Sequence, residues 1–123
     1  MEFDELSNKV IGCAIEIHKQ LGPGLLESAY ERCLSYEFIC AGIRHIPQME
    51  LPLDYKGSKL DCGYRVDLFV ESELIVELKA VDKLLPIHEA QLLTYMKLSG
   101  AKTGLLMNFN VTRLKDGIKR FVL

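Results

Sequence analysis

The sequence predicts an α/β domain in which helices cover a β-sheet, and three observations lead to this fold class. Apolar residues recur at three- and four-residue spacing through the first 42 residues, as they do in amphipathic helices. The chain then changes to the two-residue alternation of strands, and it returns to helical spacing after Pro86. Two further strand patterns close the sequence. The expected order is ααβββαββ, which is typical of a layered α/β domain.

The first two elements are predicted to be helices. We expect the first over residues 4–21, where the glycine–proline–glycine sequence at 22–24 ends it. The second is expected over residues 25–41, with Gly42 available as its C-terminal cap. Cys13 and Cys33 fall within these apolar patterns, so we expect reduced thiols in the core rather than disulfides.

Three extended stretches follow. The first covers residues 43–55, and Pro47 and Pro52 are best tolerated there on an edge strand or at bulges. A turn at residues 56–58 leads to the other two stretches, YRVDLFV at 64–70 and LIVELKA at 74–80.

The remaining elements are one helix and two closing strands. Helical spacing runs from Pro86 to Ser99, where Gly100 stops it. The segments TGLLMNF and GIKRFVL are expected as strands on either side of a loop that contains Lys115, Asp116 and Gly117.

Length and composition limit the possible functions. A chain of 123 residues that is 49% hydrophobic fits one domain, residues 1–123, with a substantial core. With 17 acidic and 15 basic residues the chain has no overall attraction to polyanions, so any contact with nucleic acid must be local. The acidic start and the lack of an apolar run near the ~20 residues that span a bilayer predict a soluble, cytoplasmic protein without membrane association.

The two strands over 64–70 and 74–80 bring charges together. Strand alternation places Arg65, Asp67 and Phe69 on one face and Val66, Leu68 and Val70 on the other. In a hairpin centred on Ser72, Asp67 lies opposite Glu77, and Lys79 shares the face of Glu77. Like charges facing each other across a sheet are destabilising. A divalent cation such as Mg²⁺ or Mn²⁺, which prefers oxygen ligands, would neutralise them and would place Lys79 beside a bound water or a phosphate.

A simpler interpretation of the same residues remains open at this point. Glu77 and Lys79 could form a solvated pair on the outer face of the sheet, and such surface pairs are common and contribute little stability.

Four short motifs in order resemble a known family. Residues 24–30 match the pattern GxxExxY, residues 63–67 are similar to a strand with a metal-binding aspartate, Glu77-Leu78-Lys79 is an ExK sequence, and residues 91–95 fit QxxxY. Over residues 4–123 the chain resembles the GxxExxY protein family of the PD-(D/E)XK nuclease superfamily, and QxxxY is typical of its lambda-exonuclease and RecB-like branch. The resemblance implies a restriction-endonuclease-like core, a mixed sheet flanked by helices. Val66 stands where the superfamily has a proline, which is not a ligand.

The resemblance also implies roles for individual residues. Asp67, Glu77 and the backbone carbonyl of Leu78 would hold Mg²⁺ or Mn²⁺, with Glu27 contributing directly or through water. Lys79 would position or activate the attacking water, and Gln91 and Tyr95 would orient the lysine or contact the substrate.

Three further candidates come from the residues themselves. Tyr30 shares a helical face with Glu27, Arg65 shares a strand face with Asp67, and His88 lies in a polar stripe with Gln91 and Tyr95. The structural interpretations are a core role for Tyr30 and Tyr95 and a surface position for His88.

We therefore expect a Mg²⁺- or Mn²⁺-dependent phosphodiesterase that acts on nucleic acid, with DNA as the expected form. One alternative is a nuclease fold that binds without cutting and relies on a partner to deliver substrate, since the basic groups near the C-terminus are few: Arg113, Lys115, Lys119 and Arg120. Another is an assembly protein whose apolar edge forms a homodimer.

Overall fold

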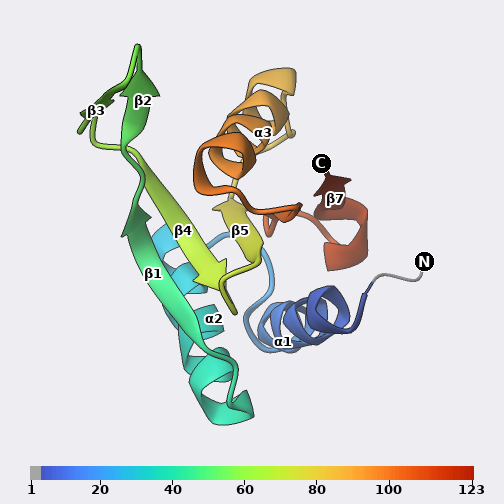
Figure 1. Ribbon diagram of the computed structural model, residues 1–123. Coiled ribbons are helices and arrows are strands. Elements are labelled where there is room, and N and C mark those ends of the chain that lie inside the picture. Colours follow the sequence, from blue (N-terminus) through green and yellow to red (C-terminus); the bar gives the residue numbers. More distant parts are fainter. Residues whose placement is uncertain (1–3) are drawn as a thin grey trace.

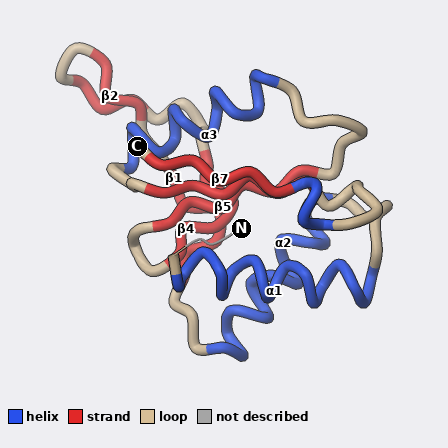
Figure 2. The backbone as a smooth tube through the Cα atoms, turned by 90° about the vertical axis from the view of Figure 1, so that its right-hand side faces the viewer, coloured by secondary structure: helices blue, strands red, loops and turns tan. Residues whose placement is uncertain are grey.

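The computed structural model describes residues 4–123 and has three layers (Figure 1). The helices are α1 (Glu5–Leu21), α2 (Glu27–Ala41) and α3 (Pro86–Ser99), with a short 3₁₀ helix, η1 (Leu114–Gly117). The main sheet consists of β1 (His45–Glu50), β4 (Arg65–Val70), β5 (Leu74–Lys79), β6 (Thr103–Asn108) and β7 (Ile118–Val122). In Figure 2, α1 and α2 lie on one side of this sheet and α3 on the other. This confirms the predicted α/β class with helices on both faces of a central sheet.

The sheet is mixed, with the strand order β1-β4-β5-β6-β7. β5 and β6 are parallel and α3 connects them, whereas the other neighbouring pairs are antiparallel. A parallel pair needs a long crossover, and α3 supplies it. The strand β5 consequently lies in the middle of the sheet.

The first two helices begin slightly later than predicted, for local reasons. Asp4 is the N-cap of α1 rather than its first residue, and its carboxylate accepts a hydrogen bond from Ser7 N at 2.8 Å. Partial burial of Asp4 opposes ionisation, but hydrogen bonds from Ser7 and Arg120 outweigh it and lower its pKa to about 2. α2 begins at Glu27 because Leu26 still has extended dihedral angles, and it ends at Gly42 in the left-handed conformation.

The extended stretch before β4 differs from the prediction. It is interrupted after Glu50, and β2 (Leu53–Tyr55) pairs instead with β3 (Ser58–Leu60) in a separate two-stranded sheet. The β2–β3 hairpin extends away from the main sheet (Figure 1). β3 was not predicted, because a three-residue strand of mixed polarity has no clear periodicity. Pro47 lies in edge strand β1, as expected.

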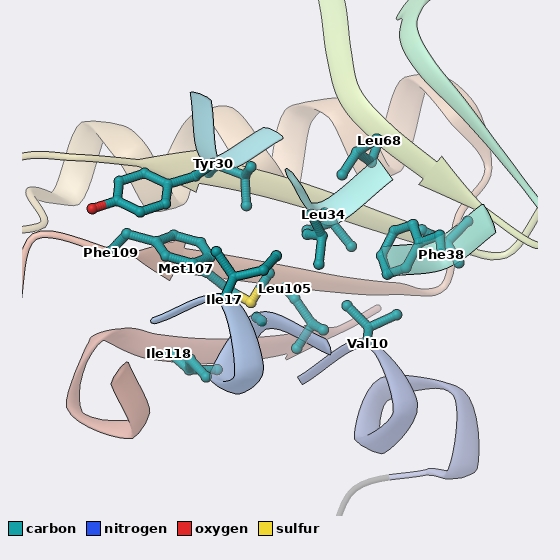
Figure 3. Packing of buried hydrophobic residues seen from close by; sticks show 14 of the residues in the cluster. Val10, Ile17, Tyr30, Leu34, Phe38, Leu68, Leu105, Met107, Phe109 and Ile118 are labelled. Carbon is teal, nitrogen blue, oxygen red and sulfur yellow. The ribbon is translucent and has the colours of Figure 1, made fainter. Parts of the chain in front are cut away.

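Two hydrophobic clusters lie on opposite faces of the sheet. The first joins α1 and α2 to the sheet, and Figure 3 shows Tyr30, Leu34 and Phe38 of α2 in it. The second lies under α3 and includes Ile75, Leu92 and Leu106. The prediction that Val66 shares a face with Leu68 is wrong, because Val66 packs in the second cluster and Leu68 in the first. The alternation along β4 is therefore broken at Asp67.

All four cysteines are free thiols. Cys13 and Cys33 are half-buried against the first cluster, while Cys40 and Cys62 are exposed. Within residues 4–123, no helix has the length and apolar character needed to cross a membrane.

Candidate active site

The β4–β5 hairpin brings the predicted carboxylates together at its open end. The ladder pairs Val70 with Leu74 and Leu68 with Val76, which is the register of a hairpin centred on Ser72. At the next position the carboxylates replace the backbone partners. Asp67 N donates to Glu77 Oε2 at 2.7 Å, and Leu78 N donates to Asp67 Oδ2 at 2.8 Å. Each carboxylate is thus fixed by a backbone N–H of the opposite strand.

The two carboxylates lie where charge is poorly solvated. Glu77 is only 5% exposed. Burial and the neighbouring charge of Asp67 raise the pKa of Glu77 to about 8, and burial also raises the pKa of Asp67. The pair therefore holds a proton near neutral pH in the absence of a cation. Glu77 is not a solvated surface residue, so the simpler interpretation of this strand as an exposed ion pair is wrong.

Lys79 follows Glu77 at the end of β5 and is half-buried. Its charge lowers the pKa values of both Asp67 and Glu77, in part offsetting their burial. Among residues 4–123 its ammonium group forms no hydrogen bond or ion pair. The ammonium is therefore available to a ligand at this end of the hairpin.

The α2 side of the pair is a cavity of about 220 Å³ lined by Glu27, Ser28, Glu31, Gln48 and Asp67. Glu27 Oε2 lies 3.4 Å from Ala80 N, directly after Lys79. Gln48 Nε2 donates a hydrogen bond to Glu31 Oε1 and lies 3.4 Å from Asp67 Oδ1. Burial raises the pKa of Glu31. α2 thus contributes two acidic side chains close to Asp67.

The α3 side is formed by the predicted pair Gln91 and Tyr95. Gln91 Nε2 donates to Tyr95 Oη at 3.0 Å, so the two residues act as one unit. Tyr95 is 5% exposed, and burial together with the charge of Glu77 raises its pKa. The ring of Tyr64, which lies just before β4, is 6.0 Å from that of Tyr95. The carboxylate pair is therefore flanked by α2 on one face and α3 on the other.

The three further candidates have partners outside this group. Tyr30 is fully buried, donates to Gly22 O at 2.5 Å and accepts from Leu25 N at 3.2 Å. Its ring stacks on Phe109 with centroids 4.4 Å apart (Figure 3). His88 Nδ1 accepts from Leu85 N at 2.9 Å and so caps α3. Arg65 forms an ion pair with Glu50 at 3.3 Å and donates a hydrogen bond to Tyr64 O at 3.0 Å.

Two residues near the site were missed by the sequence analysis. Gln48 had no pattern to identify it, because its partners lie 17 and 19 residues away. Asn108 is 2% exposed; its side chain accepts from Val81 N at 3.1 Å and donates to Val81 O at 2.9 Å, which fixes the chain just after Lys79. The signal for Asn108 was present in the sequence, since it is a polar residue at the end of an apolar strand.

The donor set at the open end suits a hard cation that retains water. Each carboxylate has one oxygen bound to a backbone N–H; within residues 4–123, Glu77 Oε1 accepts no hydrogen bond. In that part of the chain, no three side chains of the His, Cys, Asp or Glu type are grouped so as to hold a metal by themselves. Mg²⁺ and Mn²⁺ do not require this, because they bind through one or two carboxylates together with waters and carbonyl oxygens.

Comparison with known protein families identifies the superfamily to which the chain belongs. Residues 4–121 match the family model described as PD-(D/E)XK nuclease superfamily, and the chain belongs to this superfamily. The mixed five-stranded sheet between helices is consistent with its restriction-endonuclease-like fold. No curated protein and no solved structure matches the chain. Membership indicates a nuclease-type function, and such nucleases generally use divalent metals.

Proposed function

We propose that the protein is a nuclease that depends on Mg²⁺ or Mn²⁺ and hydrolyses phosphodiester bonds of nucleic acid, with DNA as the expected substrate. One observation carries the proposal: two adjacent carboxylates, one of them buried, are held at the end of a strand with no ion pair from residues 4–123 to either. Burying such a pair without a cation costs stability, and function explains why the cost is retained.

In this proposal Asp67, Glu77 and the backbone carbonyl of Leu78 hold the cation, and Glu27 contributes through water. When bound, the cation would supply Lewis-acid polarisation of water and of the phosphate. The backbone N–H groups of Asp67 and Leu78 keep the carboxylates in a fixed orientation before any ligand arrives. This preorganisation avoids reorganising the site during the reaction.

Lys79 and Tyr95 would act on the substrate. The Lys79 ammonium, which forms no hydrogen bond or ion pair within residues 4–123, would donate hydrogen bonds to a phosphate oxygen or to the attacking water. Tyr95 keeps its proton at neutral pH, as a tyrosine ordinarily does, and burial raises its pKa further. Its hydroxyl is therefore available as a donor while Gln91 donates to its oxygen. Asn108 would position Lys79 through the segment that it binds at Val81.

The motif over residues 24–30 supports placement in the GxxExxY branch, and QxxxY supports the lambda-exonuclease and RecB-like group. The two ends of the first motif would have different roles here. Tyr30 binds the loop at Gly22 and Leu25, and this loop leads directly into α2, where Glu27 is the first residue. Tyr30 would thus position Glu27 rather than contact the substrate.

Charge distribution bears on how substrate would reach the site. Three of the four basic residues near the C-terminus are already paired. Arg113 lies 4.0 Å from Asp116, Lys119 lies 2.7 Å from Glu89 and Arg120 lies 2.6 Å from Asp4. With a net charge of −2, the chain has little surface for following a phosphate backbone. A delivery partner or a second copy of the chain would therefore supply part of the phosphate contacts.

The test is a metal-dependence assay on labelled single- and double-stranded DNA and RNA. We expect cleavage by the parent with Mg²⁺ or Mn²⁺, and none with EDTA. Asp67→Asn and Glu77→Ala should each reduce the rate on the order of a thousandfold. Glu73→Gln, an acid-to-amide change on the exposed turn of the same hairpin, should cleave as the parent does. Binding of nucleic acid without cleavage in any metal would instead identify a non-catalytic nuclease fold.

A further inference from the structure

Gln48 has an unusual backbone conformation for a residue in a strand. Its φ is +51°, in the left-handed region that residues with a Cβ rarely adopt. In the β1–β4 ladder, Pro47 pairs with Leu68 and Met49 with Val66, but Gln48 and Asp67 between them are not paired. The distortion in β1 is thus directly opposite the carboxylate that is proposed to hold the cation.

Packing of the Gln48 side chain does not explain the distortion. Gln48 is exposed to solvent, so no buried apolar surface offsets the unfavourable φ. The distortion coincides with a break in the alternation of β4. Val66 packs in the cluster under α3, whereas Leu68 packs in the cluster under α1 and α2. Asp67 lies at this change and reaches Leu78 N on the neighbouring strand. Residues held in such sparsely populated backbone conformations cluster at active sites and ligand-binding sites.

The side chain of Gln48 connects two layers of the molecule. Its amide nitrogen donates to Glu31 of α2 and lies 3.4 Å from Asp67 Oδ1, the oxygen not bound by Leu78 N. A neutral amide can hold two carboxylates together without cancelling their charge. A lysine or arginine in the same place would pair with them and compete with a cation.

From these observations we propose that Gln48 is a positioning residue of the active site. Its amide orients Asp67 for cation binding and holds α2, with Glu27 and Glu31, against β4. The inference rests on the proposed function, since it assigns Gln48 a role in the same cation site.

Two variants separate positioning from a purely structural role. Gln48→Met keeps the length of the side chain and removes the donor, whereas Gln48→Gly removes the side chain and relieves the strained φ. Gln20→Met is the matched control, because Gln20 Nε2 also donates to a glutamate, Glu16 Oε1, at 3.0 Å, but on the exposed face of α1. Mn²⁺ affinity is measured by calorimetry, folding by thermal unfolding, and cleavage as kcat and KM.

We expect both Gln48 variants to fold, with Gln48→Gly unfolding at no lower temperature than the parent. Both should bind Mn²⁺ about ten- to a hundredfold more weakly and lose kcat by a similar factor, with KM for the nucleic acid within about twofold. Parent-like Mn²⁺ affinity and kcat in both variants, with Mn²⁺ still bound by the parent, would overturn the role of Gln48 alone. A parent that neither binds Mn²⁺ nor cleaves would overturn the proposed function and this role with it.

Discussion

The two ends of the β4–β5 hairpin differ in how the strands are joined and in what they contribute. At the turn end, Leu68–Val70 and Leu74–Val76 close the backbone ladder, and every one of these residues except Phe69 is buried. At the open end, the Asp67 and Glu77 carboxylates occupy the places of backbone partners. The turn end stabilises the fold, while the open end retains charge that the fold would be more stable without. Stability and function are thus separated along a single hairpin.

Leu74→Ala should break the turn end and produce the largest loss of stability. Leu74 is 1% exposed in the first cluster, and a cavity in such a place costs about 2–5 kcal/mol of unfolding free energy. Urea denaturation monitored by circular dichroism measures this loss. Cleavage per folded molecule should stay close to that of the parent, because the site lies at the other end of the hairpin.

Glu77→Gln should have the opposite effect, by stabilising the metal-free protein at neutral pH. The folded-state pKa of Glu77 is raised to about 8 from an ordinary value of 4.5, so its contribution to stability is fully present below pH 4.5. Between these values the folded state binds more protons than the unfolded state, and unfolding free energy falls as pH rises.

The expected pH-dependent loss from this one carboxyl is a few kcal/mol, complete above about pH 8. Denaturation curves between pH 5 and 8 in EDTA should therefore show a fall for the parent that is much smaller for Glu77→Gln. If the unfolding free energy falls equally steeply with pH in the two proteins, Glu77 is not buried as a protonated acid.

The two tyrosines of the motifs provide a second, smaller contrast. Tyr95→Phe removes the hydroxyl that Gln91 binds beside Glu77, and we expect about a tenfold loss of kcat with little change in stability. Single-turnover cleavage measures this loss. If Tyr95→Phe cleaves with the kcat of the parent, the Tyr95 hydroxyl has no role in the reaction.

Tyr30→Phe should do the reverse, with the smallest effect. It removes the hydrogen bonds to Gly22 O and from Leu25 N, which together stabilise the fold by about 1–2 kcal/mol. The melting temperature should fall. The cleavage rate of the folded Tyr30→Phe protein should decrease by a smaller factor than that of Tyr95→Phe. A tenfold or greater loss of cleavage by the folded Tyr30→Phe protein would instead give the Tyr30 hydroxyl a role in the reaction.

The elements that depend on residues close together in the sequence could be predicted from the sequence. Helix periodicity identified α1, α2 and α3, and the register of β4 and β5 followed from the turn at Ser72. The same register predicted that Asp67 and Glu77 lie close together, although the ladder ends at the Leu68–Val76 pair and the two residues meet through carboxylate–backbone hydrogen bonds.

What could not be predicted depends on contacts between distant segments. Gln48 binds Glu31 and approaches Asp67 only because β1 pairs with β4 and α2 packs across both, and no spacing in the sequence encodes this. The break in alternation at Asp67 was missed for the same reason, since it accompanies a left-handed residue on a different strand. Tyr30 shares a helical face with Glu27, yet the loop at Gly22 takes its hydroxyl.

The central claim is that the open end of the β4–β5 hairpin binds a divalent cation, and calorimetric titration with Mn²⁺ near neutral pH tests it most directly. The parent should bind Mn²⁺ at millimolar concentration or below and release protons on binding, because the carboxylate pair holds a proton in the metal-free protein. In Glu77→Gln the affinity should fall at least about tenfold and the proton release should disappear. No saturable binding by the parent at millimolar Mn²⁺, or equal binding by the two proteins, would contradict the claim.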